Sequence, residues 1–246
     1  MKKIIDLAPK KKHRTAFSIS LFLKNNFRST WWFAVLISLL PLASLSYSFA
    51  IDQLGINPLE TLTHSTGKWS LIFLILTLLI TPLRRIVAWL SRKVHASYGK
   101  RMADWNWIIR LRRMLGLYCF FYAVLHLLIY LHYDLGWEWQ YLWEDIEEKN
   151  YLLIGLITFT LLTLLAITSL NKIIRWMGKY WRRLHQLIYL ISILVLVHFW
   201  MLVKVGVYSP LPYSIMIALL LIYRVIAHFG LLFNKPKDQG EILIER

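Results

Sequence analysis

The sequence predicts an all-α integral membrane protein, a polytopic bundle of six transmembrane helices. Of its 246 residues, 58% are hydrophobic, and several apolar runs approach the length of a membrane span. A hydrocarbon core of about 30 Å needs roughly 20 helical residues to cross it, so these runs are typical of transmembrane helices. The sequence lacks the short alternating strands of a transmembrane barrel, which also favours helices.

The apolar runs give the expected helices in order. We expect them at about 31–50, 69–83, 114–133, 151–170, 184–203 and 211–229. The connections are expected to be an outer loop at 51–68, a basic loop at 86–113, an acidic loop at 134–150 and a second basic loop before 184. The chain then divides into a basic N-terminal tail (1–30), one transmembrane domain (31–229) and a short C-terminal tail (230–246).

The first apolar run could also be a signal peptide, because Ser48-Phe49-Ala50 resembles a cleavage site. However, Trp31–Ala50 is longer than the roughly 7–15 apolar residues of a signal peptide. We therefore expect an uncleaved first helix, kinked at Pro41, which packed membrane helices tolerate.

The distribution of charge predicts the orientation of the helices. The chain has 29 Lys and Arg against 13 Asp and Glu. Such an excess can indicate nucleic-acid binding, but here the positive residues lie between apolar runs. With both termini in the cytoplasm, only Lys68, Lys149 and Lys204 fall on the outer side. The reverse orientation would violate the positive-inside rule at every loop.

Two of the expected helices carry histidines at membrane depth, where ionisable residues are costly and usually functional. His126 follows Arg113 by 13 positions and His198 follows Arg183 by 15. At about 1.5 Å per residue, the two histidines lie roughly 20 and 22 Å from the cytoplasmic side. Facing imidazoles at matched depth could be the two axial ligands of a low-spin haem in the bundle.

Such a haem would be of the non-covalent b type, because no Cys-x-x-Cys-His motif is present. The only cysteine, Cys119, lies inside an apolar run. One cysteine cannot form a disulfide or a cysteine-rich metal site within the chain, so we expect it to pack as a small core residue.

His185 lies nearer the cytoplasmic side and defines a separate, inner level. It precedes His198 by 13 residues, which is about 140° from alignment on an ideal helix. Both can face one cleft only if the helix bends. At this depth the third helix offers Arg112 and Arg113, which either anchor at the interface or pair with a haem propionate or flavin phosphate. The inner level could hold a flavin, a quinone head group or a haem with an unusual second ligand.

Several motifs between residues 55 and 223 occur together in one known family. They are GINPLETLTHSTGKWSL (Gly55–Leu71), LLITPLRR (Leu78–Arg85), RRMLGL (Arg112–Leu117), Leu125–His126, AITS (Ala166–Ser169), and GKYWRRLHQLIYL (Gly178–Leu190) with the later His198. With them the chain resembles the MsrQ (YedZ) family, the haem-binding membrane subunits of the bacterial periplasmic methionine-sulfoxide reductase system. This family belongs to the ferric-reductase-like transmembrane domains.

The resemblance implies that His126, His185 and His198 are haem-associated, and that His64 matches a histidine of the family's outer loop. The wider superfamily carries two histidines on each of two helices. This chain has three, with Arg112 or Arg113 near the missing inner position. The departure argues against a full second haem, and the family's association with FMN makes an inner flavin an expectation.

The implied role is that of a non-catalytic electron-transfer subunit in the bacterial inner membrane. Electrons from the quinone pool or a cytosolic flavin reductase would pass to a periplasmic molybdopterin subunit that repairs oxidised methionine in envelope proteins. The chain has no Gly-x-Gly-x-x-Gly, so it is not expected to use NADPH by itself. The acidic, Trp-rich loop Asp134–Asn150 is a candidate docking surface.

Two alternatives stay open. The first is a self-standing transmembrane ferric or quinone reductase on the same scaffold. The second is a proton channel or transporter whose histidines relay protons.

Overall fold

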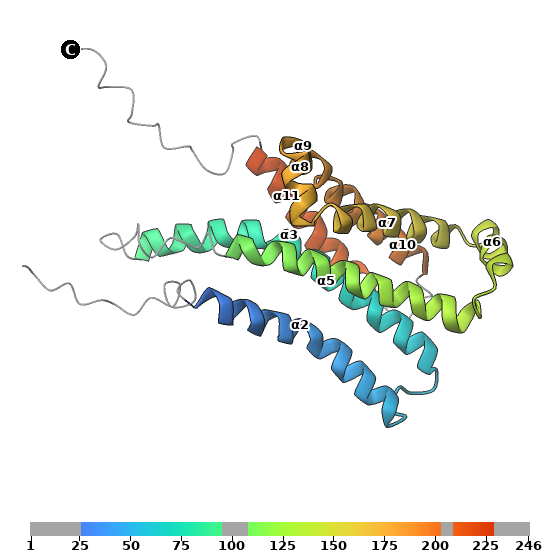
Figure 1. The fold of residues 1–246 in the computed structure, drawn as a ribbon. Helices are drawn as coiled ribbons and strands as arrows, with labels where there is room; N and C mark the ends of the chain where they lie inside the picture. Colours follow the sequence, from blue (N-terminus) through green and yellow to red (C-terminus); the bar gives the residue numbers. More distant parts are fainter. Residues whose placement is uncertain (1–25, 95–107, 203–208, 229–246) are drawn as a thin grey trace, which may run out of the picture.

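A computed structural model describes residues 26–94, 108–202 and 209–228 (Figure 1). Over these residues all regular structure is helical, and no strand occurs. The elements are α2 (Phe27–Ala50), α3 (Pro58–Val94), α5 (Ile108–Ile129), the π-helix η1 (Tyr130–Asp134), α6 (Trp139–Glu148), α7 (Asn150–Ile167), α8 (Asn171–Met177), α9 (Lys179–Leu184), α10 (Leu187–Leu202) and α11 (Leu211–His228). The tails expected at 1–30 and 230–246 lie outside the described residues, except that residues 27–30 already belong to α2.

Five helical stretches are long and apolar enough to cross a membrane: Phe27–Ala50, Pro58–Leu90, Ile108–Asp134, Asn150–Ile167 and Lys179–Leu202. The sixth expected span corresponds to α11 (Leu211–His228), whose apolar stretch Leu211–Ala227 is slightly shorter than the other five. The predicted all-helical, multi-pass membrane fold is therefore confirmed, with five helices of full spanning length among the described residues.

The bundle is built from two helical pairs (Figure 1). Helix α3 packs along α5, and α7 packs along α10, while α11 contacts both α3 and α10. The core where these helices meet contains Leu74, Leu78, Ile191 and Ile217, whose side chains are at most 1% exposed. This core lies between the level of His126 and His198 and the basic end of the bundle, and it holds the two pairs together.

Helix α3 departs most from its expected bounds, because it begins at Pro58 and continues to Val94. At its start the Asn57 side chain accepts a hydrogen bond from the Glu60 backbone N–H (3.3 Å) and donates one to the Glu60 carboxylate (3.0 Å). Proline suits the first helical position, since its missing N–H would have no helical partner there. Much of the expected outer loop and part of the basic loop 86–113 are therefore helical.

Pro82 does not end α3, although we expected the helix to stop near it. A proline leaves the carbonyl four residues earlier without its helical donor, and here that carbonyl belongs to Leu78. Arg224 of α11 supplies a replacement, because its Nη2 donates to the Leu78 oxygen at 3.2 Å. The polar group freed by the proline is thus satisfied by a neighbouring helix, as membrane proteins require.

Helix α2 lies at one side of the bundle and is held there by tyrosines of α5 (Figure 1). The Tyr122 hydroxyl donates to the Ser38 carbonyl (2.9 Å) and accepts from the Leu42 N–H (3.2 Å). These two backbone groups would bond each other in a regular α-helix, so the hydroxyl is inserted into the helical ladder beside Pro41. Tyr118 adds a bond to the Val35 carbonyl at 3.1 Å.

Two expected loops also contain helices. The acidic loop 134–150 includes α6, which is amphipathic and fastened by Asp145. This carboxylate accepts from the Tyr130 hydroxyl and from Lys149 Nζ, both at 2.6 Å. The second basic loop forms α8 and α9, and the chain then turns at His185 and Gln186 before α10 begins.

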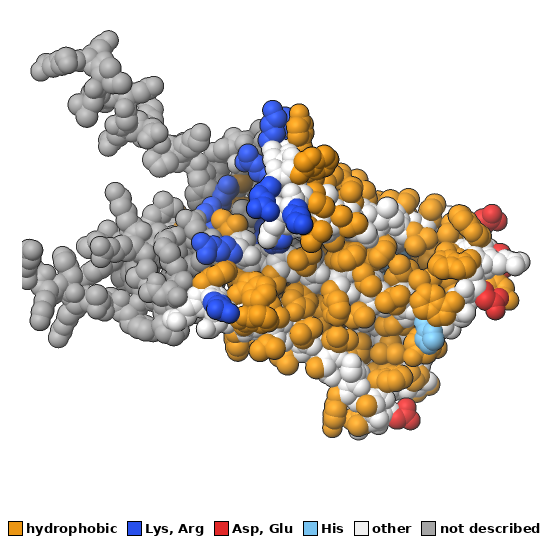
Figure 2. All heavy atoms as spheres, in the orientation of Figure 1, with side chains coloured by type: hydrophobic (Ala, Val, Ile, Leu, Met, Phe, Trp, Pro, Cys, Tyr) orange, Lys and Arg blue, Asp and Glu red, His pale blue; other side chains and the backbone are white. Residues whose placement is uncertain are grey.

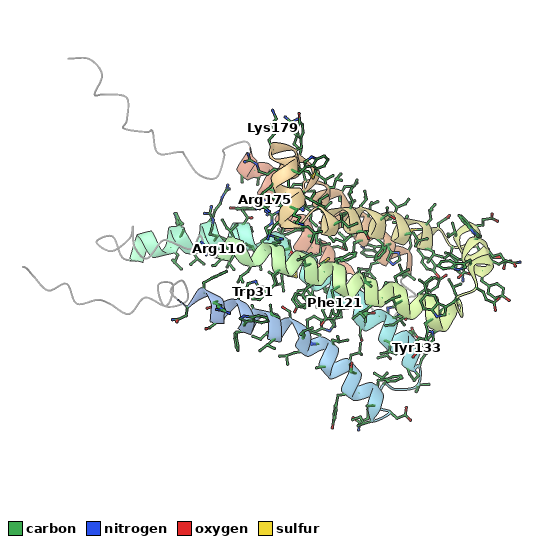
Figure 3. The ribbon with its side chains drawn as sticks, viewed as in Figure 1. Trp31, Arg110, Phe121, Tyr133, Arg175 and Lys179 are labelled. Atoms are coloured by element: carbon green, nitrogen blue, oxygen red, sulfur yellow. The ribbon has the colours of Figure 1, made fainter. Side chains whose placement is uncertain are left out.

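The two ends of the bundle differ in charge (Figure 2). Among the described residues every Asp and Glu lies at the end that carries α6, whereas Lys and Arg gather at the end that carries α8 and α9. Figure 3 marks Arg110, Arg175 and Lys179 at the basic end and Tyr133 at the other. This polarity agrees with cytoplasmic termini and an outer side that is nearly free of positive charge.

Candidate functional site

His126 of α5 and His198 of α10 face each other between the two helical pairs. Their ring centroids are 6.4 Å apart, and their planes are inclined by 89°. Both side chains are partly buried. The two residues that the sequence placed at matching depth are therefore brought together by the fold.

Each of these rings is held by a backbone carbonyl of the neighbouring helix. His126 Nδ1 lies 2.9 Å from the Thr63 oxygen on α3, and His198 Nδ1 lies 2.8 Å from the Tyr151 oxygen on α7. A carbonyl can only accept, so Nδ1 carries the proton in both rings and Nε2 keeps its lone pair. A second hydrogen bond of this kind is what usually orients a metal-binding histidine.

A glycine lies against each ring, one helical turn after the carbonyl that holds it. A Cβ built at Gly67 would lie 3.1 Å from His126 Nδ1, and one built at Gly155 would lie 2.9 Å from His198 Cε1. Neither glycine was singled out from the sequence. For Gly155 a signal was present, because a glycine in the middle of an apolar helix is unfavourable without a packing reason. Gly67 lay in the expected outer loop 51–68, so no such signal was present for it.

This arrangement fits an iron bound between the two rings. An imidazole nitrogen lies about 2 Å from a bound metal, and each ring centre lies about 1 Å behind that nitrogen, so rings on opposite sides have centres about 6 Å apart. The observed separation of 6.4 Å agrees with this value. The donor set, two imidazoles with free Nε2 atoms, is also one that haem iron accepts.

His185 occupies a different level, at the turn between α9 and α10. Its Nε2 lies 3.3 Å from the Ser169 hydroxyl, and its Nδ1 lies 3.2 Å from the Trp181 carbonyl. The Trp181 ring covers it at a centroid distance of 4.1 Å, and this indole donates to the Thr168 carbonyl at 3.0 Å. The sequence required a bend for His185 and His198 to face one cleft. The chain has this bend at His185 and Gln186, between the end of α9 and the start of α10.

The two arginines at this level have different surroundings. Arg112 is partly buried and interacts electrostatically with Arg224 and Tyr189. Arg113 is exposed and donates to the Asn171 side chain at 2.6 Å. Of the two, Arg112 is the one whose charge acts on His185.

His64 was expected in the outer loop, but it lies in the second turn of α3, because that helix starts earlier than predicted. Its Nε2 lies 3.6 Å from the Glu60 carboxylate. Cys119 is buried in the contact between α3 and α5, where Ser70 donates to its carbonyl at 3.0 Å. Within the described ranges, no three His, Cys, Asp or Glu residues come together as a metal-binding group.

Comparison with known proteins adds independent information. Residues 66–197 match the family model described as "Ferric reductase like transmembrane component". A "Protein-methionine-sulfoxide reductase heme-binding subunit MsrQ" from Herminiimonas arsenicoxydans is 40% identical over 192 residues, which cover 76% of this chain and 80% of that protein. Proteins of the same name from Azospira oryzae and Xanthomonas euvesicatoria are 37% and 40% identical and are covered over 78% and 82% of their lengths. No solved structure gives a significant match.

Paired spanning helices that face each other through histidines define a ferric-reductase-like transmembrane domain. The chain belongs to this family and, within it, to the MsrQ family of membrane subunits. The predicted location is confirmed with it: the protein is a multi-pass protein of the bacterial inner membrane.

Proposed function

We propose that this protein is a haem b electron-transfer subunit in which His126 and His198 are the two axial ligands. The observation that carries the proposal is the 6.4 Å separation of two rings whose Nδ1 atoms are both held by carbonyls. The names of its relatives, which describe haem-binding subunits of a methionine-sulfoxide reductase, point the same way. A haem bound here would supply a one-electron carrier in the outer half of the membrane.

The residues around the site have distinct tasks in this proposal. Thr63 and Tyr151 fix the tautomer of each histidine through their carbonyl oxygens, so that Nε2 is the ligating atom. The apolar side chains of α5 and α10 exclude water, which keeps protons from competing for that nitrogen. Electrons would leave toward the end that carries α6, where a periplasmic molybdopterin-containing methionine-sulfoxide reductase would receive them.

Electron entry is proposed at the inner level, around His185 and Arg112. The quinone pool or a cytosolic flavin reductase would be the donor, and either an FMN or a quinone head group would suit this polar, partly buried setting. Ser169 and the indole of Trp181 lie against the imidazole, and Arg112 would favour an anionic group there. His64, beside Glu60, is proposed to shape the outer end of α3.

The surface of α6 is the proposed docking site for the reductase. Trp139 and Trp143 are 61% and 66% exposed, beside the acidic residues Glu144, Glu147 and Glu148. Exposed tryptophans are enriched at the centres of protein interfaces. Replacing both tryptophans by alanine should weaken co-purification of the reductase without altering the absorption spectrum of the membrane subunit.

The central experiment is an absorption spectrum of the purified protein. Wild type should show a Soret band that shifts on reduction with dithionite, and His126→Ala or His198→Ala should abolish the low-spin spectrum. His132→Ala is a matched control. This histidine also lies toward the outer end of the bundle, but it accepts a hydrogen bond from Trp137 Nε1 at 3.0 Å and, among the described residues, is not paired with a second histidine across the bundle. Retention of the low-spin spectrum in both ligand variants would refute the pairing.

A colourless protein that takes up no added haem would instead favour the proton channel or transporter. If haem is bound, co-purification with a periplasmic molybdoenzyme separates the two-component system from a self-standing ferric or quinone reductase.

A further inference from the structure

We propose that Gly67 and Gly155 are positioning residues that hold the two axial imidazoles nearly perpendicular to each other. Each glycine leaves the space in which one histidine ring lies. The inference rests on the proposed ligation of haem by His126 and His198, and it assigns a role to two residues that have no functional group of their own.

A Cβ at Gly155 would clash with the His198 ring, and a Cβ at Gly67 would contact the His126 ring more tightly than Cβ atoms usually do. A Cβ at Gly155 would lie 2.9 Å from Cε1 and 3.0 Å from Nδ1 of His198. One at Gly67 would lie 3.1 Å from Nδ1 and 3.2 Å from Cε1 of His126. Non-bonded carbon atoms prefer separations of about 3.5–4.0 Å. In both places the obstacle is the ring itself, so an added methyl group has to move the ligand.

The rings cannot move without losing a second contact. Thr63 lies four residues before Gly67, and Tyr151 lies four residues before Gly155. The carbonyl that holds each Nδ1 and the glycine that receives each ring therefore belong to adjacent turns of one helix, α3 or α7. A Cβ would push the ring off its carbonyl or turn it about its own axis, and either change redirects Nε2.

The two glycine contacts are built in the same way on the two helical pairs. In each, the earlier helix provides the carbonyl and the glycine, and the later helix provides the histidine. Glycine is unfavourable in a helix interior compared with alanine. Its use at both equivalent positions therefore indicates a steric need on each side of the site.

The angle between the rings offers a direct readout. The imidazole planes are inclined by 89°. In a low-spin ferric haem, perpendicular axial planes leave two iron orbitals close in energy and give a strongly anisotropic EPR signal. Parallel planes separate these orbitals and bring the largest g value down. Turning one ring should therefore shift the EPR signal, whereas a general loss of packing should not.

The first test compares Gly67→Ala and Gly155→Ala with Gly116→Ala. Gly116 is a matched control, because it too lies inside a helix, α5, where that helix contacts α3, but its Cβ would meet Thr77 Cγ2 at an ordinary 3.9 Å. Gly155→Ala is expected to lose most of its haem, measured as the haem-to-protein ratio. Gly67→Ala is expected to retain more haem with a smaller largest g value, and Gly116→Ala should resemble wild type. Wild-type haem content and EPR signals in both test variants would overturn the proposal.

A second test does not require bound haem. In haem-free protein, Gly155→Ala should lower the midpoint of thermal unfolding, but in a His198→Ala background it should leave the midpoint unchanged or raise it, because the ring is gone. An equal decrease in both backgrounds would overturn the proposed contact. Failure of wild type to bind haem would refute the proposed function. The comparison of Gly155→Ala in the wild-type and His198→Ala backgrounds would still report on the contact between the glycine and the ring.

Discussion

Arg224 Nη2 donates a hydrogen bond to the carbonyl oxygen of Leu78 at 3.2 Å, across the contact between α11 and α3. This carbonyl is free because Pro82, four residues later, has no N–H. The same guanidinium donates from Nη1 to the Tyr189 hydroxyl at 3.1 Å. Arg224 thus bonds the carbonyl that Pro82 leaves without a helical donor, and it links α11 to both helical pairs.

Replacing Arg224 by leucine should therefore destabilise the protein. The carbonyl of Leu78 would lose the donor that Arg224 supplies, which costs about 1–3 kcal/mol. In a Pro82→Ala background, the new backbone N–H can reach the same carbonyl, so the loss should be smaller. Thermal unfolding in detergent measures both effects. Equal losses in the two backgrounds would mean that Arg224 acts through Tyr189 alone.

Removing the Tyr122 hydroxyl should loosen α2. Tyr122→Phe leaves the Ser38 carbonyl and the Leu42 N–H without their shared partner, a loss of about 1 kcal/mol for a hydrogen bond of this kind. Hydrogen exchange at the Leu42 amide should become faster. Tyr118→Phe, which removes a single bond to Val35, is the control and should leave Leu42 unchanged. Unaltered exchange in Tyr122→Phe would show that the ladder closes without the hydroxyl.

The attachment of α6 should depend on pH. Burial raises the pKa of Asp145, but hydrogen bonds from Lys149 and Tyr130 outweigh it and hold that pKa below its usual value. The hydrogen bond to Asp145 raises the pKa of Lys149. Asp145 therefore stabilises the fold above its unfolded pKa of about 4 and loses that effect as pH falls through its folded pKa. Lys149 stabilises the fold below its unfolded pKa of about 10 and loses that effect as pH rises through its raised folded pKa.

Fluorescence of the α6 tryptophans measures this dependence. The emission of wild type should be constant between about pH 5 and 9 and change on acidification. Asp145→Asn should show the loosened state throughout, with no transition at low pH. An acid transition that survives in Asp145→Asn would have to come from another carboxylate.

His185→Ala should separate the inner level from the outer one. His126 and His198 lie nearer the outer end of the bundle, and His185 makes no contact with them in the described structure, so the low-spin spectrum should be spared. Reduction by quinol or by a reduced flavin should become slower, because the variant loses the imidazole between Ser169 and Trp181. Ser169→Ala removes only the hydroxyl contact and should have a smaller effect. An unchanged rate of reduction would count against electron entry at His185.

The sequence was sufficient to predict an all-helical, multi-pass membrane fold and the meeting of His126 with His198. Hydropathy and charge act along the chain, and helical rise converts position into depth, so these features need no knowledge of packing. The early start of α3 was also readable, since Asn57, Pro58 and Glu60 form a helix start signal. The continuous apolar run begins only at Trp69, so hydropathy alone places the start of the helix too late.

Other features depend on how the helices are rotated about their axes. The contacts of Gly67 and Gly155 with histidines of other helices require the register between helices, which one sequence does not reveal. The same holds for Arg224, which reaches a carbonyl 146 residues earlier in the chain. The choice of Arg112 over Arg113 at the inner level also depends on the rotation of α5. Depth could be predicted in each of these cases, but direction could not.

In the proposed function an electron crosses the protein from the inner to the outer side, and the uneven charge of the two ends bears on its energy. Moving outward, it leaves the arginines and lysines and approaches carboxylates, which repel it. The inside-negative membrane potential acts in the opposite sense and contributes about 2.3 kcal/mol per 100 mV for a full crossing. At the depth expected for His126 and His198, an electron would have passed most of that voltage drop. An energised membrane should therefore speed reduction of the outer site, and collapse of the potential by an ionophore should slow it.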